Sequence, residues 1–210
     1  MPILDFPKND TQQLYLPVVA SQQEGGRYKE LIDAAKAAGT EYSKIWDLFA
    51  FRESFTVHLA QFTQGVLRSS ASLDSAMREL IAALTSFQNE CGFCTQAHAA
   101  AAAELLGSEA LVWSVLHDLE SSPLEAKEKA LLRLTSKIIR RLPTITSEDI
   151  EQVRAQGWDD EAIYYAITTC ALFDFYNRWI TATGVPEMSA AHRLQGQNLA
   201  QRGYIREEKK

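Results

Sequence analysis

The chain of 210 residues has an ordinary globular composition, 46% hydrophobic and 23% charged, which is enough for one sizeable core. A formal net charge of -6 with no clustered basic stripe argues against nucleic acid as the main partner. No apolar stretch approaches the ~20 residues that cross a bilayer, and the start lacks a basic segment followed by an apolar run. We therefore expect a cytoplasmic protein without membrane contact.

Helical periodicity dominates the chain after an N-terminal arm. Residues 1–26 contain three prolines and end in two glycines, and we expect an irregular arm on the surface. Beyond them, apolar residues recur at steps of three and four, which is typical of helices. The predicted helices cover about 27–38, 42–66, 73–89, 91–106, 108–119, 124–142, 146–157 and 159–183.

Capping and breaking residues separate these helices. Ser72 or Asp74 can cap the helix that starts near residue 73, and Gly107 is a suitable left-handed residue after the one that ends at 106. No window shows sustained alternation of period two between hairpin turns, so the sequence predicts an all-α fold. We expect one compact multi-helix domain at 27–186, followed by a C-terminal extension at 187–210.

A Cys-x-x-Cys pair opens one of the predicted helices. Cys91, Cys94 and His98 stand at positions i, i+3 and i+7, so all three project from one helix face. The two cysteines can close a short disulfide, and His98 can exchange a proton with Cys94. Unpaired backbone N–H groups and the positive end of the helix dipole favour a thiolate in the first turn. This arrangement is typical of a redox-active dithiol.

The third cysteine has a different setting. Cys170 lies in an apolar run of the last long helix, which indicates a buried core thiol. In a reducing cytosol, a close pair such as Cys91 and Cys94 is typical of catalysis or metal binding, and not of a structural disulfide.

Zinc binding is the chemical alternative to redox activity. Cys91, Cys94 and His98 supply three zinc-type ligands, and Glu79 can be a fourth. Structural zinc sites usually bring two such pairs from separate loops, whereas the other histidines stand alone in this sequence. We therefore favour the dithiol and expect no bound metal or cofactor.

Two groups of residues carry a family resemblance. Glu79 stands twelve residues before Cys91, and Cys91-x-x-Cys94-x-x-x-His98 follows. The downstream group consists of Glu125-x-x-Glu128-Lys129-Ala130-Leu131-Leu132, Thr146-x-x-Asp149-Ile150, Gly157-Trp158-x-Asp160-Glu161 and Phe173-x-Phe175-Tyr176-Asn177-Arg178. Over roughly residues 43–186 the chain resembles the carboxymuconolactone decarboxylase superfamily, in its alkyl hydroperoxidase D branch and most closely the peroxidase-related proteins.

The resemblance implies an activity and roles for four residues. It implies an all-helical subunit that assembles with copies of itself and reduces organic hydroperoxides. In that pattern Cys94 attacks the peroxide, Cys91 is the resolving thiol, and Glu79 with His98 forms the proton relay. We expect a homo-oligomer built on a dimer, with a hexamer as one form.

One position departs from the family pattern. Alkyl hydroperoxidase D has a second histidine between its cysteines, where this chain has Phe93. Phenylalanine can neither activate a thiol nor carry a proton. We therefore expect Cys91 to keep a high thiol pKa, and Cys94 to be activated by the helix start, by His98 and by Glu79.

The sequence thus predicts a thiol-dependent peroxidase that is recycled by an external dithiol or lipoyl-type electron donor. A dithiol redox sensor, or a thiol-disulfide oxidoreductase without efficient peroxidase turnover, is the first alternative. A decarboxylase of the carboxymuconolactone type is the second, although that chemistry needs an acid and an anion clamp and not two thiols. Some of the many aromatic side chains can line an apolar entrance for the substrate.

Overall fold

The structure is a computed structural model that describes residues 6, 9, 11–187 and 192–205. The described residues form eleven α-helices, one 3₁₀ turn and no β-strand, so the all-α prediction is confirmed. The helices are α1 (Pro17–Ser21), α2 (Arg27–Ala37), α3 (Ile45–Phe51), α4 (Glu53–Arg68), α5 (Ser75–Gln88), α6 (Gly92–Leu106), α7 (Glu109–His117), α8 (Ala126–Arg141), α9 (Ser147–Ala155), α10 (Asp160–Thr183) and α11 (His192–Arg202), with the 3₁₀ turn at Leu142–Thr144.

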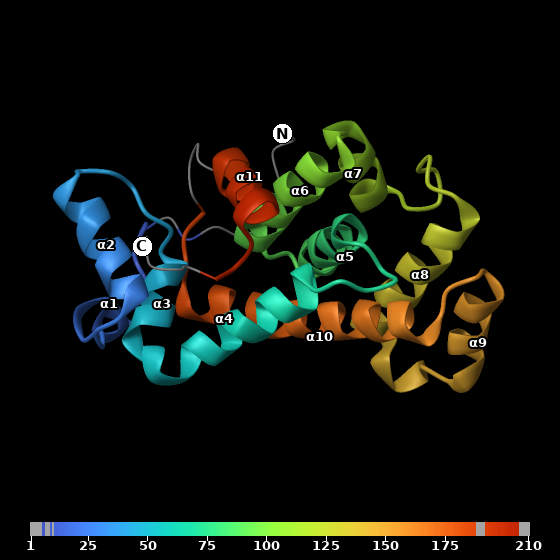
Figure 1. The fold of residues 1–210 in the computed structure, drawn as a ribbon, viewed down its shortest axis with the longest axis horizontal. Coiled ribbons are helices and arrows are strands. Elements are labelled where there is room, and N and C mark those ends of the chain that lie inside the picture. Colours follow the sequence, from blue (N-terminus) through green and yellow to red (C-terminus); the bar gives the residue numbers. More distant parts are fainter. Residues whose placement is uncertain (1–5, 7–8, 10, 188–191, 206–210) are drawn as a thin grey trace.

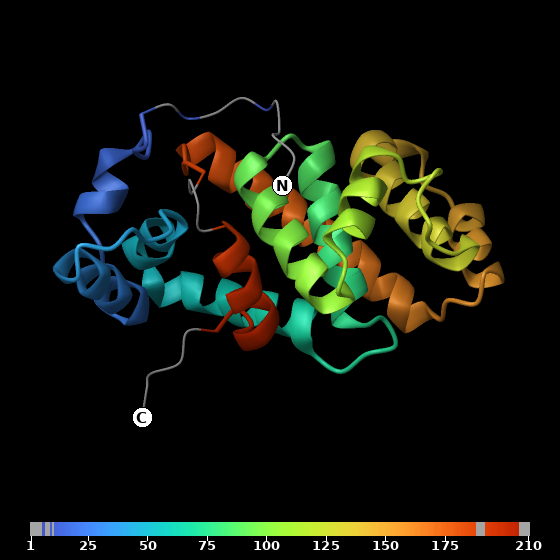
Figure 2. The same cartoon turned by 90° about the horizontal axis from the view of Figure 1, so that it is seen from above.

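The long helix α10 runs along the length of the molecule (Figure 1). Helices α1 to α3 lie at one end, and α8 and α9 lie at the other. Helix α5 packs against both α6 and α10, and α11 lies on α6, as the view from above also shows (Figure 2). One apolar cluster joins α5, α7, α8 and α10, and a second joins α2, α3 and α4 to the start of α6. The start of α6 therefore lies inside the second cluster.

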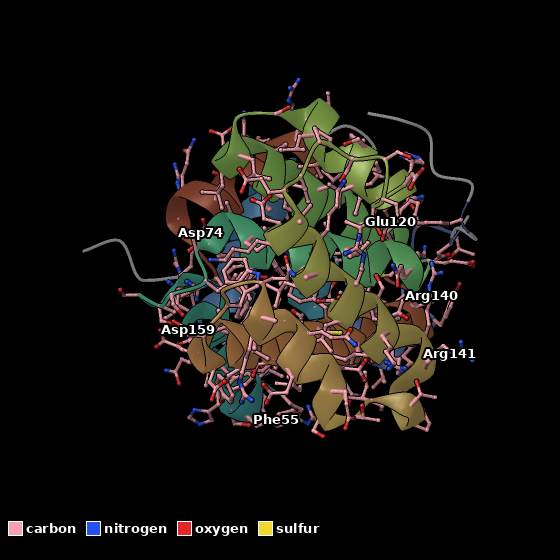
Figure 3. The ribbon with its side chains drawn as sticks, turned by 90° about the vertical axis from the view of Figure 1, so that its right-hand side faces the viewer. Phe55, Asp74, Glu120, Arg140, Arg141 and Asp159 are labelled. Carbon is pink, nitrogen blue, oxygen red and sulfur yellow. The ribbon has the colours of Figure 1, made fainter. Side chains whose placement is uncertain are left out.

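Side-chain caps fix the starts of two central helices. Asp74 Oδ1 accepts the backbone N–H of Met77 at 2.7 Å and caps α5, while Asp159 Oδ1 accepts that of Ala162 at 2.8 Å and caps α10. Both carboxylates lie along the same edge of the molecule (Figure 3). Ser72, the other predicted cap of α5, instead donates its hydroxyl to Asp159 at 2.6 Å. This contact joins the starts of the two helices.

The single helix predicted over 42–66 is wrong, because the chain breaks at Arg52 (φ -144°, ψ 62°) into α3 and α4. The break lets two carboxylates cap helices across the gap. Glu53 accepts the N–H of Arg27 at 2.8 Å, and Glu24 accepts the N–H of Ser54 at 3.1 Å. These contacts satisfy N–H groups at the starts of α2 and α4.

The N-terminal arm differs from its prediction in one respect. It contains the short helix α1, which begins at Pro17, a residue whose fixed φ suits a first helical turn. The arm is also held at the end of α10. The N–H of Tyr15 donates to Thr183 O at 3.0 Å, and the side-chain amide of Asn9 donates to Gly184 O at 2.6 Å.

The C-terminal extension packs closely on α6 through α11. A Cβ atom on Gly196 would lie 2.4 Å from Ala100 Cβ and 2.7 Å from the backbone nitrogen of Ala101, so only glycine allows this approach. The alanine run of α6 supplies the small side chains on the other side of the contact. After α11, Gly203 adopts φ +69° and turns the chain back toward α4. None of the described helices is both long and apolar enough to traverse a bilayer.

Candidate dithiol site

The cysteine pair lies at the start of α6, as the sequence predicts. Cys91 is the N-cap residue and Cys94 lies in the first turn, while Gly107 ends the helix in the left-handed conformation. Both cysteines are free thiols, and both are buried, with exposed fractions of 3% and 2%. His98 follows one turn after Cys94 and is also buried. The described structure therefore holds the pair in its reduced form inside the fold.

Glu79 and His98 form the pair that the spacing predicts. Glu79 lies on α5 and is 0% exposed, and His98 Nδ1 lies 2.7 Å from its Oε2. The contact forms because α5 and α6 pack along each other. When Nδ1 carries the proton and donates it to Glu79, the other nitrogen of the neutral imidazole, Nε2, is free to act as a base. Glu79 thus orients the ring and fixes its tautomer.

Two further residues complete the surroundings of Glu79. Arg68, at the end of α4, donates to Glu79 Oε1 at 2.5 Å and to Leu199 O at 2.9 Å. Tyr204, after α11, donates its hydroxyl to Glu79 Oε1 at 2.6 Å and lies 3.3 Å from His98 Nδ1. The glutamate therefore has partners from α4, α6 and the C-terminal extension.

This network sets the charge on Glu79. Burial alone raises the pKa of the carboxyl, but His98, Arg68 and Tyr204 outweigh burial and lower its pKa below the ordinary value. Glu79 is therefore a carboxylate at neutral pH. Burial and the same carboxylate raise the pKa of Tyr204 well above its ordinary value, so its hydroxyl keeps the proton that it donates.

Polar side chains from α5 and α10 surround the two thiols. Asn177 contacts both cysteines, Ser86 contacts Cys94, and Thr181 contacts Cys91. Asn177 also donates to Ser86 Oγ at 3.0 Å, which fixes the amide between the helices. These groups stabilise negative charge on sulfur, because each lowers the pKa of the thiol that it contacts.

The thiol pKa values differ from the sequence-based expectation. A hydrogen bond from Cys94, in spite of burial, lowers the pKa of Cys91 to about 7. Burial, together with the neighbouring Cys91, raises the pKa of Cys94 well above its ordinary value. The expected high pKa of Cys91 is therefore wrong for the reduced pair. Cys91 is the N-cap residue of α6, at the positive end of the helix dipole, whereas Cys94 lies within the first turn.

Cys94 and His98 open onto a common cavity of about 70 Å³. Its walls are largely aromatic and aliphatic, with Trp46 and Phe49 from α3 and Phe173 from α10. Tyr204 and Gln195 come from the C-terminal extension. Gln195 Oε1 is buried without a hydrogen-bond partner among the described residues. A ligand in this cavity would meet one thiol, one imidazole and mostly apolar surface.

The other sequence candidates lie elsewhere. Cys170 belongs to the apolar cluster around α5 and α8, and burial raises its pKa to about 12. His58 is exposed on α4 and contacts Gln61. Within the part of the chain that the structure describes, no three His, Cys, Asp or Glu side chains are arranged to hold a metal ion.

Three residues of the candidate site were not predicted as site residues from the sequence. Arg68, Asn177 and Tyr204 reach the site from α4, α10 and the C-terminal extension, far along the chain from the cysteine motif. Asn177 stands within a stretch that resembles the family, so that stretch gave a signal for it. Arg68 and Tyr204 carry no local pattern that distinguishes them from surface residues.

Comparisons with known proteins agree with this architecture. Residues 58–117, which span most of α4, α5, α6 and α7, match the sequence model of the carboxymuconolactone decarboxylase family. The search of curated protein sequences gave no match. Several solved structures match the fold.

Two of these are uncharacterized peroxidase-related proteins. The one from Silicibacter sp. TM1040 has a TM-score of 0.69 and 24% identity, and the match covers 92% of this chain and 94% of that protein. The one from Ralstonia eutropha JMP134, called an alkylhydroperoxidase AhpD core, has a TM-score of 0.69 and 20% identity over 80% of this chain and 88% of that protein.

A third structure, of a protein of unknown function from Agrobacterium tumefaciens, has a TM-score of 0.56 and 19% identity. That match covers 66% of this chain and 96% of the other protein. At these identities the likeness shows a common fold, whereas the sequence match at residues 58–117 connects the helices that carry the cysteine motif to a family. Residues 58–117 thus match the carboxymuconolactone decarboxylase family, and the chain shares its fold with solved structures that include two peroxidase-related proteins.

Proposed function

We propose that the protein is a thiol-dependent peroxidase that reduces hydroperoxides through Cys94 and Cys91. The observation that carries this proposal is that Cys94 and His98 line one cavity, while Glu79 binds the far nitrogen of the imidazole. A nucleophile, a base and an orienting carboxylate are the parts that an activated thiol requires. Two solved structures with the same fold are named as peroxidase-related proteins, which is a further reason for this choice.

The first step takes place in the aromatic cavity. His98 Nε2 accepts the proton of Cys94, and the thiolate attacks the outer oxygen of the hydroperoxide. The O–O bond breaks, its electron pair leaves with the inner oxygen, and His98 returns the proton to give the alcohol. Because burial raises the pKa of Cys94, this thiol depends on a base for its activation.

The second step uses the other cysteine. Cys91 attacks the sulfur of the Cys94 sulfenic acid, the S–O bond breaks, and the departing hydroxide takes up a proton to become water. The side chains of Thr181 and Asn177 also lower the pKa of Cys91 and so favour the attacking thiolate. An external dithiol must then reduce the Cys91–Cys94 disulfide, which suits a reducing compartment such as the cytoplasm.

The cavity indicates the class of hydroperoxide. A volume of about 70 Å³ is smaller than the ~150 Å³ of a cavity that holds benzene. It suits the peroxide group and a short apolar substituent, and Gln195 Oε1 can accept the O–H of the hydroperoxide. We therefore expect small alkyl hydroperoxides to react faster than hydrogen peroxide, which gains nothing from apolar walls, and faster than cumene hydroperoxide, which is too large.

The decisive experiment is single-turnover oxidation of the two cysteine variants, with dimedone trapping and mass spectrometry. Cys91→Ser should consume one equivalent of hydroperoxide and stop at a sulfenic acid on Cys94. Cys94→Ser should react far more slowly, because Cys91 does not line the cavity that holds His98. Fast reaction of Cys94→Ser alone would assign the attack to Cys91, and slow stoichiometric oxidation of the unmodified protein without turnover would favour a redox sensor.

Self-association is part of the proposal. Exposed rings stand on two helices that pack together, Phe55 and Phe62 on α4 and Phe175 on α10, with exposed fractions of 64%, 51% and 48%. Phe55 projects at the periphery of the molecule (Figure 3). Several exposed rings on neighbouring helices are typical of an interface, and we propose that a second copy of the chain covers them.

A further inference from the structure

Cys91 opens onto a different cavity from Cys94. This second cavity, of about 100 Å³, lies between the start of α6, the end of α10 and the N-terminal arm. Cys91 and Gly92 line it, whereas Cys94 and His98 line the aromatic cavity. Phe93 and Ile180 line both cavities, so the two cavities are adjacent. Each cysteine therefore borders a different cavity.

The N-terminal arm forms one wall of the Cys91 cavity. The ring of Tyr15 lies against Gly184, where a Cβ atom would be 2.6 Å from the ring. The hydrogen bond from Tyr15 N to Thr183 O holds the arm there, and Asn9 adds its amide contact to Gly184. This wall is thus fixed to the end of α10.

Two carboxylates flank Cys91 in this cavity. Glu187 lies so close to α6 that a Cβ on Gly92 would overlap its carboxylate, and it accepts a hydrogen bond from Gln96 at 3.0 Å. Glu90, the residue before Cys91, is exposed and lines the same cavity. Two carboxylates therefore line the cavity of Cys91, whereas the aromatic cavity contains no carboxylate among its described lining residues.

We propose that the reducing dithiol reaches Cys91 through this second cavity, and that Glu90 and Glu187 select against a donor that carries negative charge. The proposal deepens the proposed function, on which it rests for the origin of the disulfide. Substrate and reductant then use opposite faces of the pair, so that neither has to leave before the other arrives.

The reduction balances as two thiol-disulfide exchanges. A thiolate of the donor attacks Cys91 sulfur, the Cys91–Cys94 bond breaks, and Cys94 leaves with the electron pair and is protonated. The second donor thiol, after losing its proton, attacks the donor sulfur of the mixed disulfide and releases Cys91 as thiolate. The donor ends as a disulfide and the protein as two thiols. A pKa of about 7 makes Cys91 a good leaving group in this last exchange.

The test isolates the reduction by preparing the disulfide with diamide, without any peroxide. Two dithiols serve as probes: dihydrolipoamide is neutral and dihydrolipoate is anionic. The rate at which each reduces the protein is divided by the rate at which it reduces a small reference disulfide, which corrects for the intrinsic reactivity of the dithiol. At low salt the neutral probe should reduce the protein about 3- to 10-fold faster than the anionic one, as expected for unit charges a few ångströms apart in partly aqueous surroundings. High salt should bring this ratio of the two rates closer to one, because it screens the charges.

Matched charge variants assign the effect. Glu187→Gln keeps an acceptor for Gln96 and should lower the ratio of the neutral to the anionic rate by about 3-fold. The control is Glu148→Gln, at an exposed position on α9. It removes the same charge and should leave this ratio unchanged. An equal ratio in all three proteins would overturn the charge selection.

The attacked sulfur is identified separately. Oxidised protein is mixed with 2-mercaptoethanol, quenched in acid and mapped, and the adduct should be on Cys91. An adduct on Cys94 would overturn the proposed route. Both measurements start from a disulfide made by diamide. If the protein fails to consume hydroperoxide, the proposed peroxidase function is refuted, but the measured route and charge dependence of disulfide reduction still hold.

Discussion

The hydroxyl of Tyr204 lies 2.6 Å from Oε1 of Glu79, although 125 residues separate the two along the chain. The contact connects the C-terminal extension to the carboxylate that orients His98. It also helps to keep the pKa of Glu79 low, in spite of complete burial. We infer that Tyr204 is a positioning residue, which acts through Glu79 and His98.

Tyr204→Phe should therefore slow the oxidation of Cys94 by about 10-fold, since a hydrogen bond to a charged group contributes ~1.5 kcal/mol or more. Loss of the hydroxyl also removes one cause of the low Glu79 pKa, so the acidic limb of the rate profile should move to higher pH. Stopped-flow oxidation across pH measures both effects. Tyr164→Phe, at an exposed position on α10, is the control, and an unmoved acidic limb in Tyr204→Phe would contradict the positioning role.

Glu79→Gln should lower the rate of Cys94 oxidation by about 10- to 1000-fold, in line with the loss of part of a general-base relay. It should also destabilise the fold by ~3 kcal/mol or more, because Arg68 would keep a largely buried charge without its carboxylate. Single-turnover kinetics and urea unfolding measure the two effects.

The double variant Glu79→Gln with Arg68→Met separates catalysis from stability. Removing both charges should recover much of the lost stability, because replacing both members of a buried ion pair by uncharged groups often changes the free energy of unfolding little. The rate should stay low. Recovery of the rate together with the stability would mean that Glu79 only supports the fold.

The thiolate of Cys91 should titrate with a midpoint near pH 7 in Cys94→Ser, because the serine hydroxyl can replace the donor that lowers its pKa. In Cys94→Ala that donor is absent, and the pKa should rise. Thiolate absorbance against pH measures both midpoints, with Cys170→Ala in the background to remove the third thiol. Equal midpoints in the serine and alanine variants would show that the cysteine pair is not the source of the shift.

The apolar surface on α4 and α10 should hold the protein in an oligomer built on a dimer. Light scattering of the unmodified protein should give a multiple of 23.5 kDa at micromolar concentration. Phe62→Asp should lower the mass toward the monomer, whereas Leu142→Asp, which alters an equally exposed side chain beyond α8, should not. A monomer in the unmodified protein would contradict the proposed self-association.

Local signals predicted most of the helices correctly. Asp74 and Asp159 mark helix starts by the hydrogen bonds that their side chains make within one turn, and Gly107 marks an end by its left-handed conformation. The break at Arg52 has no such signal, because no proline or glycine stands there. Its cause is tertiary: Glu53 caps α2, which lies earlier in the chain.

The site was predictable as far as its residues lie on two adjacent helices. The spacing from Glu79 to His98 anticipates their contact, because α5 and α6 form a simple helical hairpin. Which thiol has the lower pKa depends on the direction of the hydrogen bond between them and on how deeply each is buried, and the motif specifies neither. Tyr204 enters only after the extension has folded back over α6.

The close approach at Gly196 has a consequence for sequence variation. Alanine is favoured over glycine in the interior of an exposed helix by ~1 kcal/mol, and helix propensity alone would favour Gly196→Ala. Here the added methyl would meet the backbone of α6 and push α11 outward, and Tyr204 with it. A substitution that favours the isolated helix would thus disturb the hydrogen bond between Tyr204 and Glu79, from a position outside the cysteine motif.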